Sequence, residues 1–436
     1  MELSSLPGFR DFFPQEMRRR AHILGVWRDV ATRYGFEEYD GPPLEPLELY
    51  TRKSGEEIVS QLYEFEDQGG RRVALRPEMT PTFARMVGAR AGGLPKPIRW
   101  FSMPQLFRYE RPQKGRLREH FQLNMDIVGE SDEAADAEIV AAAIDVLRAF
   151  GLTAEDVVVR ISDRRVIAAR LMELGATESH VPAILSAIDR VDKQSEAESL
   201  KSLREAGLSE DAAAGVLALT TADPQLDAFT SGAVGTGAGT EEAAASLRRV
   251  IERLETMGLG DFVQFDPTIV RGLAYYTGTV FEIWDRRGEF RAICGGGRYD
   301  DLLAALGGPD LPALGFGMGD VVLGELLEAR GLWPEEGAAV QDFIVCVTPE
   351  ERPLGLRAAH ALRDAGRRVA YDLTERSVGR QFKAADQAGA ERAIVIGPDE
   401  AVEEAAVIRD LATGTEKKVP LAEVARFAEL TERLAD

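Results

Sequence analysis

The pattern of hydrophobic and polar positions divides the chain into helical and mixed stretches. Apolar spacing predicts a helix over residues 15–34, stopped by Gly35, and an amphipathic helix over residues 131–150, closed by Gly151. From residue 162 to residue 229 the pattern is almost continuously helical, which predicts a helical module inserted into a mixed first domain. The glycine-rich segment 231–240 has no strand before it and no Gly-Lys-Ser/Thr after it, so we interpret it as a flexible linker.

Strand-like alternation and glycine turns return over residues 262–326, and the segment 333–337 is typical of an interdomain linker. An apolar run at residues 343–347, a helical pattern ending at Gly366, a strand near Val369, a helix over residues 378–388 and a strand at residues 393–396 then follow in turn. This alternation predicts a small α/β domain with a largely parallel sheet that folds as a unit of its own.

Length and composition agree with this organisation. The chain has 436 residues, of which 45% are hydrophobic, as expected for a soluble protein of about three domains. No apolar run approaches the ~20 residues of a membrane span, and the N-terminus lacks a secretory signal pattern. We therefore expect a cytoplasmic protein with no membrane partner. The two cysteines and four histidines show no metal-ligand spacing, so no protein-bound metal site is predicted.

The net charge of −21 argues against non-specific binding to polyanions but allows a local basic patch. The densest basic cluster is RYERPQKGRLR at residues 108–118, with five Lys or Arg and one acid. Pro112 and Gly115 predict a turn between two arms, and arginines on such a loop can bind phosphate oxygens in bidentate fashion. A solvated charged loop is the alternative interpretation of this cluster.

The segment after the basic cluster favours a binding site. Residues 121–129 alternate as a strand that presents Gln122, Asn124 and Asp126 on one face. Burying such a polar face costs free energy unless its groups find partners. A ligand would supply those partners.

Residues 107–129 resemble motif 2 of class II aminoacyl-tRNA synthetases, in the form used by histidyl-tRNA synthetases. The segments RGLAYY at residues 271–276 and GGGRYD at residues 295–300 are similar to two signatures of that family. Residues 75–80 resemble its amino-acid-binding loop, Pro42 falls at the proline of motif 1, and residues 315–319 resemble the start of motif 3. Residues 376–383 resemble part of its anticodon-binding domain.

The resemblance implies an α+β protein: a class II synthetase antiparallel-sheet catalytic domain with a helical insertion, followed by a small α/β anticodon-binding domain. We expect the catalytic core at residues 1–160 and 241–330, the insertion and linker at residues 161–240, and the anticodon-binding domain at residues 331–436. The implied activity is histidine–tRNA ligation, in which L-histidine and ATP give histidyl-adenylate and pyrophosphate, and histidine then passes to the 3′-terminal adenosine of tRNA(His). Mg²⁺ would assist the leaving pyrophosphate, and motif 1 implies a homodimer.

The resemblance also assigns roles to single residues. Arg108 would hold the α-phosphate, and Arg271 would lie between this phosphate and the histidine carboxylate, which makes both catalytic candidates. The ATP-binding candidates are Arg108, Glu110 and Arg116. The histidine-binding candidates are Glu78, Thr80 and Gln122 for the ammonium group, Asp126 and Tyr276 for the imidazole, Arg271, and Tyr275, which could equally be a packed core residue. The tRNA-binding candidates are Arg111, Gln113, Lys114, Arg118, Arg376, Arg380 and Lys383.

Two positions depart from the common pattern of the family. Val322 stands where motif 3 usually has an arginine that stacks on adenine and contacts the γ-phosphate, and Ala274 stands where an aspartate is usual. A branch of the family that includes plant organellar enzymes looks similar at both positions. The rival hypotheses are a synthetase-like, histidine-binding regulatory subunit of ATP phosphoribosyltransferase and a non-catalytic tRNA-binding module. Such regulatory subunits usually lack the anticodon-binding domain and the motif 2 cations, both of which this chain has.

Overall fold

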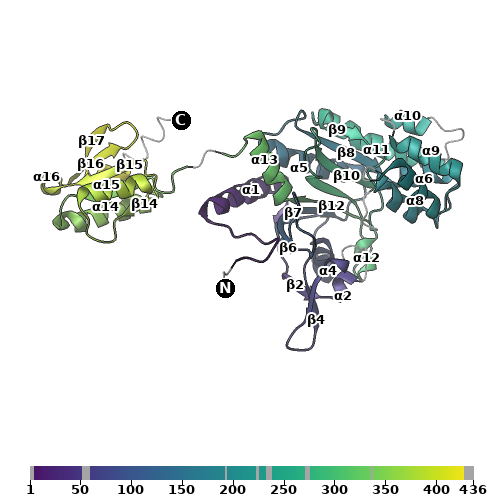
Figure 1. Cartoon of the computed structure of the whole chain (residues 1–436), viewed down its shortest axis with the longest axis horizontal. Coiled ribbons are helices and arrows are strands. Elements are labelled where there is room, and N and C mark those ends of the chain that lie inside the picture. Colours follow the sequence, from purple (N-terminus) through teal and green to yellow (C-terminus); the bar gives the residue numbers. More distant parts are fainter. Residues whose placement is uncertain are drawn as a thin grey trace. The chain divides into compact units, whose positions relative to one another are not determined.

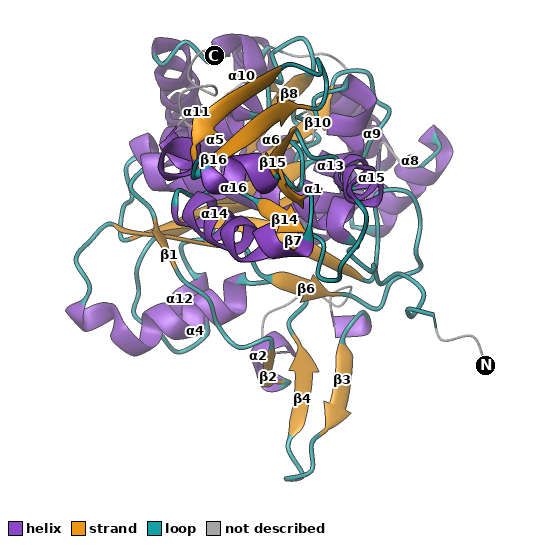
Figure 2. Cartoon of the chain, turned by 90° about the vertical axis from the view of Figure 1, so that its left-hand side faces the viewer, coloured by secondary structure: helices purple, strands orange, loops and turns teal. Residues whose placement is uncertain are grey.

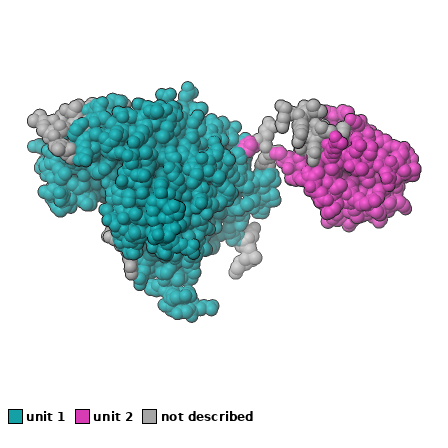
Figure 3. All heavy atoms as spheres, turned by 180° about the vertical axis from the view of Figure 1, so that it is seen from behind, with its two compact units in different colours: residues 1–333 teal, residues 334–436 magenta. Residues whose placement is uncertain are grey.

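Two units make up the chain in the computed structural model, residues 1–333 and residues 334–436 (Figure 3). The structure describes residues 4–51, 59–191, 194–221, 225–231, 238–270, 275–334 and 337–426. Among these residues no helix is both long enough and apolar enough to cross a lipid bilayer.

A large sheet forms the centre of the first unit, with the strand order β1-β5-β7-β12-β11-β10-β8-β9 and with β6 paired to β7 (Figure 1). Its strands are β1 (Glu37–Glu38), β5 (Ile98–Ser102), β6 (Gln105–Phe107), β7 (Glu119–Val128), β8 (Val157–Asp163), β9 (Val263–Phe265), β10 (Thr279–Asp285), β11 (Cys294–Arg298) and β12 (Ala313–Gly319). Every pairing from β5 across to β8 is antiparallel, and only the β1–β5 and β8–β9 pairs are parallel. The predicted antiparallel catalytic sheet is confirmed.

The two faces of this sheet differ because side chains alternate along each strand. Leu123, Met125 and Ile127 of β7 belong to the main apolar core, together with residues of α1 (Pro14–Arg33) and α5 (Glu133–Ala149). Both helices lie where the sequence predicts them, and Asp132 caps α5 by accepting a hydrogen bond from the Ala134 amide at 2.8 Å. The alternate positions Gln122, Asn124 and Asp126 therefore face the opposite side, as predicted.

Smaller elements cover that second face. A separate apolar cluster joins α4 (Thr80–Arg90) and α12 (Leu302–Ala305) to the sheet through Phe83, Val87 and Leu303. A three-stranded sheet of β2 (Leu44–Pro46), β4 (Arg72–Leu75) and β3 (Tyr63–Glu66) adjoins α2 (Glu48–Thr51), and Figure 2 shows β3 and β4 projecting as a hairpin. Helix α13 (Asp320–Arg330) follows β12 directly and ends at Gly331, whose φ is +66°.

The predicted helical module gathers at one end of the first unit in Figure 1. It consists of α6 (Arg164–Glu173), α7 (Val181–Ile188), α8 (Glu196–Glu205), α9 (Glu210–Thr221) and α10 (Leu226–Ser231). A further helix, α11 (Ala238–Thr256), lies beyond the predicted bounds of the module. Most of the predicted linker, residues 232–237, lies outside the described residues. Its last part is not a linker, because α11 begins at Ala238.

The second unit contains a five-stranded sheet with the order β14-β13-β15-β16-β17. Its elements are β13 (Asp342–Cys346), α14 (Arg352–Asp364), β14 (Val369–Tyr371), α15 (Val378–Gln387), β15 (Arg392–Ile396), α16 (Pro398–Val402), β16 (Ala405–Asp410) and β17 (Glu416–Pro420). The buried carboxylate of Asp342 pairs with Arg367 and Arg392, the latter at 2.9 Å, and thereby ties the start of β15 to β13.

The prediction of a largely parallel sheet is confirmed for the three strands from which it was made and is wrong for the two strands that follow them. Strand β13 is parallel to β14 and β15, but the β15–β16 and β16–β17 pairs are antiparallel. Only the long connections through α14 and α15 leave room for a parallel crossover, which needs about a dozen residues or more. The short connections after β15 return each strand in the opposite direction.

Candidate active site

Glycines of β12 form a floor beneath the polar side chains of β7. In the register of the sheet, Gly315 lies opposite Asp126. A Cβ on Gly315 would stand 2.2 Å from Oδ1 of Asp126, and a Cβ on Gly317 would stand 2.8 Å from Cδ of Gln122. Both distances are shorter than the non-bonded contacts that Cβ atoms make in proteins, so any side chain at these positions would displace the polar groups. The segment that resembles the start of motif 3 thus makes room for Gln122 and Asp126.

Asp126 lies at the closed end of this floor. Its carboxylate is 4% exposed and accepts a hydrogen bond from the hydroxyl of Tyr299. Burial raises the pKa of the Asp126 carboxyl to about 7, and the hydrogen bond from Tyr299 acts in the opposite direction. The rings of Tyr275 and Tyr276 pack on Tyr299 with centroids 5.8 and 6.4 Å away. The structure therefore brings Asp126 together with both predicted tyrosines.

Tyr299 is a site residue for which the sequence suggested no role. It lies in the GGGRYD segment at residues 295–300, which we identified by resemblance without assigning its side chains. Its hydroxyl reaches Asp126 across 173 positions of the chain. Its place within a family signature was the only signal that could have identified it.

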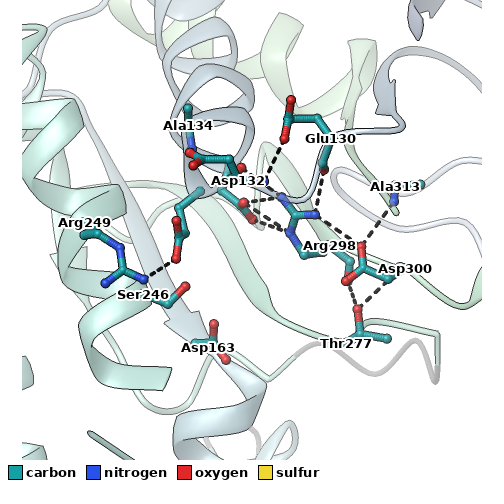
Figure 4. A network of polar contacts seen from close by, with 12 residues as sticks. Glu130, Asp132, Ala134, Asp163, Ser246, Arg249, Thr277, Arg298, Asp300 and Ala313 are labelled. Atoms are coloured by element: carbon teal, nitrogen blue, oxygen red, sulfur yellow. Dashed lines mark hydrogen bonds and ion pairs between the residues drawn. The ribbon is translucent and has the colours of Figure 1, made fainter. Parts of the chain in front are cut away.

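Arg298, its neighbour in the same signature, has a structural role (Figure 4). Its guanidinium is buried and pairs with Asp136 of α5 and with Asp300, and Nη1 lies 3.2 Å from Oδ1 of Asp300. The same Nη1 donates a hydrogen bond of 3.0 Å to the carbonyl oxygen of Glu130. Arg298 therefore anchors the end of β11 to the start of α5 and holds Tyr299 in place beside it.

The segment that resembles the amino-acid-binding loop joins the same region. Arg76 is 4% exposed and donates to Asp40 at 2.7 Å and to the Gln105 carbonyl at 3.0 Å. These bonds fix the turn before α4, in which Glu78 is buried and Thr80 is the first helical residue. Arg108 donates from Nε to the Pro77 carbonyl at 2.9 Å, so the predicted histidine loop and the predicted α-phosphate ligand are in direct contact.

A pocket of about 820 Å³ opens beside these residues. Its lining combines the basic loop, the segment between β10 and β11, and the start of α13. The lining includes the ATP candidates Arg108, Glu110 and Arg116, the histidine candidate Gln122, and the tRNA candidates Gln113 and Lys114. The other two candidates of the loop, Arg111 and Arg118, are not part of the lining; Arg111 is exposed and Arg118 lies over the Tyr109 ring.

Contacts with both walls of the pocket hold the basic loop. A bridge between Gln113 and Arg116 and a φ of +71° at Gly115 form the predicted turn. The Gly115 amide donates to Oε1 of Glu325 on α13 at 3.1 Å, and the ammonium of Lys114 lies 4.8 Å from the centre of the Phe290 ring. The loop tip is therefore placed over the pocket.

The charged side chains of the pocket include Arg108, Arg116 and the carboxylate of Glu110. Nε of Arg116 pairs with Oε2 of Glu110, a carboxylate that is 7% exposed. Burial, with the nearby charges of Arg108, Arg10 and Arg116, lowers the pKa of His120 to about 3. The His120 ring on the pocket wall is thus neutral at pH 7 and adds no positive charge.

The remaining predicted residues form two sets. Arg271 and Ala274, from the first signature, fall outside the described residues. Arg376, Arg380 and Lys383 lie in the second unit at the start of α15, all exposed. Arg376 borders a small cavity of about 60 Å³ in that unit.

Comparison with known proteins identifies the family. The family model "Histidyl-tRNA synthetase" matches residues 8–319, and the model "Anticodon binding domain" matches residues 341–430. The chain belongs to the histidyl-tRNA synthetase family. The resemblance found in the sequence is thereby confirmed.

Curated relatives extend this match over nearly the whole chain. The histidine–tRNA ligase of Opitutus terrae is 47% identical, with 96% of each chain covered. The chloroplastic/mitochondrial histidine–tRNA ligase of Arabidopsis thaliana is 40% identical over 96% of this chain and 85% of its own.

Solved structures share the fold. The histidyl-tRNA synthetase of Nostoc sp. PCC 7120 aligns with a TM-score of 0.83 at 27% identity, covering 99% of this chain and all of the other. A Bacillus halodurans protein described as an ATP phosphoribosyltransferase regulatory subunit/histidyl-tRNA synthetase aligns with a TM-score of 0.75 at 23% identity, covering 90% of this chain and 98% of its own. At that identity the likeness concerns the fold alone.

Proposed function

We propose that this chain is a histidine–tRNA ligase, which makes histidyl-adenylate from L-histidine and ATP and then transfers histidine to the 3′-terminal adenosine of tRNA(His). The observation that carries the proposal is the single polar face of β7. Asp126 occupies its buried end, and Gln122 reaches the pocket that contains Arg108. A ligand along this face would have its side chain in the closed end and its carboxylate near the basic loop.

Histidine recognition rests on paired polar groups in a buried place. The carboxylate of Asp126 accepts from an imidazole N–H, while Glu78, Thr80 and Gln122 offer acceptors to the ammonium group. A buried donor left without a partner costs about 1–3 kcal/mol. A site built from such groups therefore rejects amino acids that cannot form the same hydrogen bonds. Tyr275 and Tyr276 flank the imidazole, because both rings pack against the Tyr299 that holds Asp126.

Adenylate formation brings a carboxylate and a phosphate together, and cations must neutralise both without acting as nucleophiles. Arginine meets this need. Arg108, tied to Pro77 beside the histidine loop, binds the α-phosphate, and Arg271 lies between this phosphate and the histidine carboxylate. Arg116 binds the β- and γ-phosphates after exchanging its Glu110 partner for them.

Mg²⁺ fits the same pocket as a companion of ATP. This ion usually keeps several waters and takes one or two carboxylates together with substrate phosphates. Glu110 provides a carboxylate there, and its Oε1 is buried with no hydrogen-bond partner among the described residues. When bound, the ion would neutralise charge on the leaving pyrophosphate.

The tRNA contacts are assigned to two basic surfaces. The acceptor end would contact the basic loop through Arg111, Gln113, Lys114 and Arg118. The anticodon would contact the second unit through Arg376, Arg380 and Lys383. Positive charge on these surfaces attracts tRNA phosphates, while the net charge of −21 disfavours other polyanions. By family resemblance we also propose a cytoplasmic homodimer.

The rival hypothesis of a regulatory subunit is not favoured, because curated relatives at 40–47% identity carry the ligase name over nearly the whole chain. The direct test is histidine-dependent exchange of pyrophosphate into ATP. The wild-type protein should catalyse it, and Arg271→Ala should lower the rate by roughly 100- to 1000-fold with an unchanged melting temperature. The exposed Arg287→Ala serves as a matched control. Absence of exchange in the wild type would refute the ligase, and an unchanged rate in Arg271→Ala would remove that residue from the mechanism.

The anticodon assignment has its own test. Replacing Arg380 and Lys383 together with Gln should lower kcat/KM for tRNA by about tenfold or more, because two phosphate contacts are lost, and should leave pyrophosphate exchange intact. Arg357→Gln, an exposed cation on α14 of the same unit, should change neither reaction. Equal losses in both reactions would indicate a structural role for the α15 cations.

A further inference from the structure

Position 322 brings no charge to the nucleotide pocket. Val322, in the first turn of α13, is 8% exposed and borders the pocket. Its Cγ2 lies 3.3 Å from the point that a Cβ on Gly115 would occupy. Val322 therefore packs beneath the tip of the basic loop, and the cation usual at this position in the family has no counterpart on α13 at that point.

An arginine reaches the same point from the opposite wall. Arg291 lies in the segment between β10 and β11 and borders the pocket. Its Cδ and Cγ lie 3.6 and 3.8 Å from the same point above Gly115. The stem of Arg291 thus packs on the loop tip that Val322 supports from below, and its residue is exposed overall.

Neighbouring contacts fix this corner of the pocket. Phe290, next to Arg291 in the chain, holds the ammonium of Lys114, and Glu325 holds the Gly115 amide. The two segments that meet at the tip therefore contribute Lys114, Arg116 and Arg291 to the lining of the same pocket. Such a group of cations suits a triphosphate, and a planar guanidinium can bind two of its oxygens at once.

We propose that Arg291 is an ATP-binding residue, which supplies from the β10–β11 segment the cationic triphosphate contact that position 322 lacks. The inference rests on the proposed ligase function. In this proposal, the cation that the family usually has on α13 is supplied instead by the segment between β10 and β11.

The test uses Arg291→Gln, Arg291→Lys and the control Arg287→Gln, an exposed arginine of the same segment that does not border the pocket. In histidine-dependent pyrophosphate exchange, Arg291→Gln should raise the KM for ATP by about tenfold and change the KM for histidine by less than about twofold. Arg291→Lys keeps the charge but loses the fork, so its KM for ATP should rise by only about threefold. Arg287→Gln should behave as the wild type.

Calorimetric titration with ATP alone separates this inference from the ligase itself. Weaker ATP binding by Arg291→Gln than by Arg287→Gln would support the assignment even if the wild type lacked exchange activity. Equal ATP affinity and equal KM for ATP in these two variants would overturn it. Because Arg291 is exposed, both variants should keep the wild-type melting temperature, and a fall in both substrates' affinities would indicate a general disturbance and also reject the proposal.

Discussion

The proposed histidine end and the proposed nucleotide end of the site are built from different parts of the fold. At the histidine end, Asp126 of β7 and Tyr299, which directly follows β11, are buried, and Gly315 of the intervening β12 leaves room for the Asp126 carboxylate. At the nucleotide end, Lys114 and Arg291 extend from connecting segments and are exposed to solvent. If these assignments hold, the first end selects its ligand by shape and by completed hydrogen bonds, whereas the second attracts the negatively charged triphosphate by its cations.

This difference predicts which changes each end tolerates. Close packing makes the histidine end sensitive to the addition of a single carbon atom. The nucleotide end tolerates a cation supplied from a different segment, as the pair Val322 and Arg291 illustrates. Three measurements test this contrast, in order of decreasing expected effect.

The largest effect is expected for Gly315→Ala. The new methyl group would stand 2.2 Å from Oδ1 of Asp126 and 2.5 Å from the Met125 carbonyl oxygen, so the carboxylate must move. We expect kcat/KM for histidine to fall by about 100-fold, with a much smaller change in the KM for ATP. Gly324→Ala on α13, whose first contact would lie at 3.8 Å, is the control and should remain fully active. Equal losses for both substrates would contradict the separation of the two ends.

An intermediate effect is expected for Tyr299→Phe, and it depends on pH. The Tyr299 hydroxyl stabilises the ionised form of Asp126, whose pKa is about 7, so its removal raises this pKa further. If histidine binds to the carboxylate, the variant should show a roughly tenfold higher KM for histidine at pH 7, because less carboxylate is present and one hydrogen bond is lost. Raising the pH should restore part of the affinity.

The measurement is a profile of kcat/KM for histidine against pH for the wild type and the variant. In the wild type the value should decline as the pH falls through about 7, and in Tyr299→Phe the decline should begin at a higher pH. Asp126→Asn has an amide that cannot titrate, so its profile should not show this decline. Profiles that coincide for the wild type and Tyr299→Phe would show that this hydroxyl does not control the carboxylate.

The smallest effect is expected from salt. Raising the ionic strength from about 0.05 to 0.5 M shortens the range of Coulomb interactions severalfold, and the exposed cations of the nucleotide end are open to this screening. The KM for ATP should rise by about threefold, while the KM for histidine should change little. A parallel rise in both constants would mean that charge matters equally at both ends.

Local patterns in the sequence were sufficient for part of this site. Alternation over residues 121–129 predicted the shared face of Gln122 and Asp126, and Pro112 with Gly115 predicted the turn of the basic loop. Both depend on neighbours a few residues apart. The paired role of Asp126 and Tyr299 and the structural role of Arg298 were not predicted, because their partners are more than a hundred residues distant in the chain.

By itself, then, the sequence determined the helices, the polar face of one strand, the basic loop and the family to which they belong, since each is written in local spacing or in a short motif. The tertiary structure decided which strands became neighbours. The register that sets Gly315 against Asp126, the antiparallel return of β16 and β17, and the meeting of Arg291 with Val322 at Gly115 all follow from long-range packing. Such pairings depend on the mutual fit of distant segments, and no periodicity within a single segment encodes them.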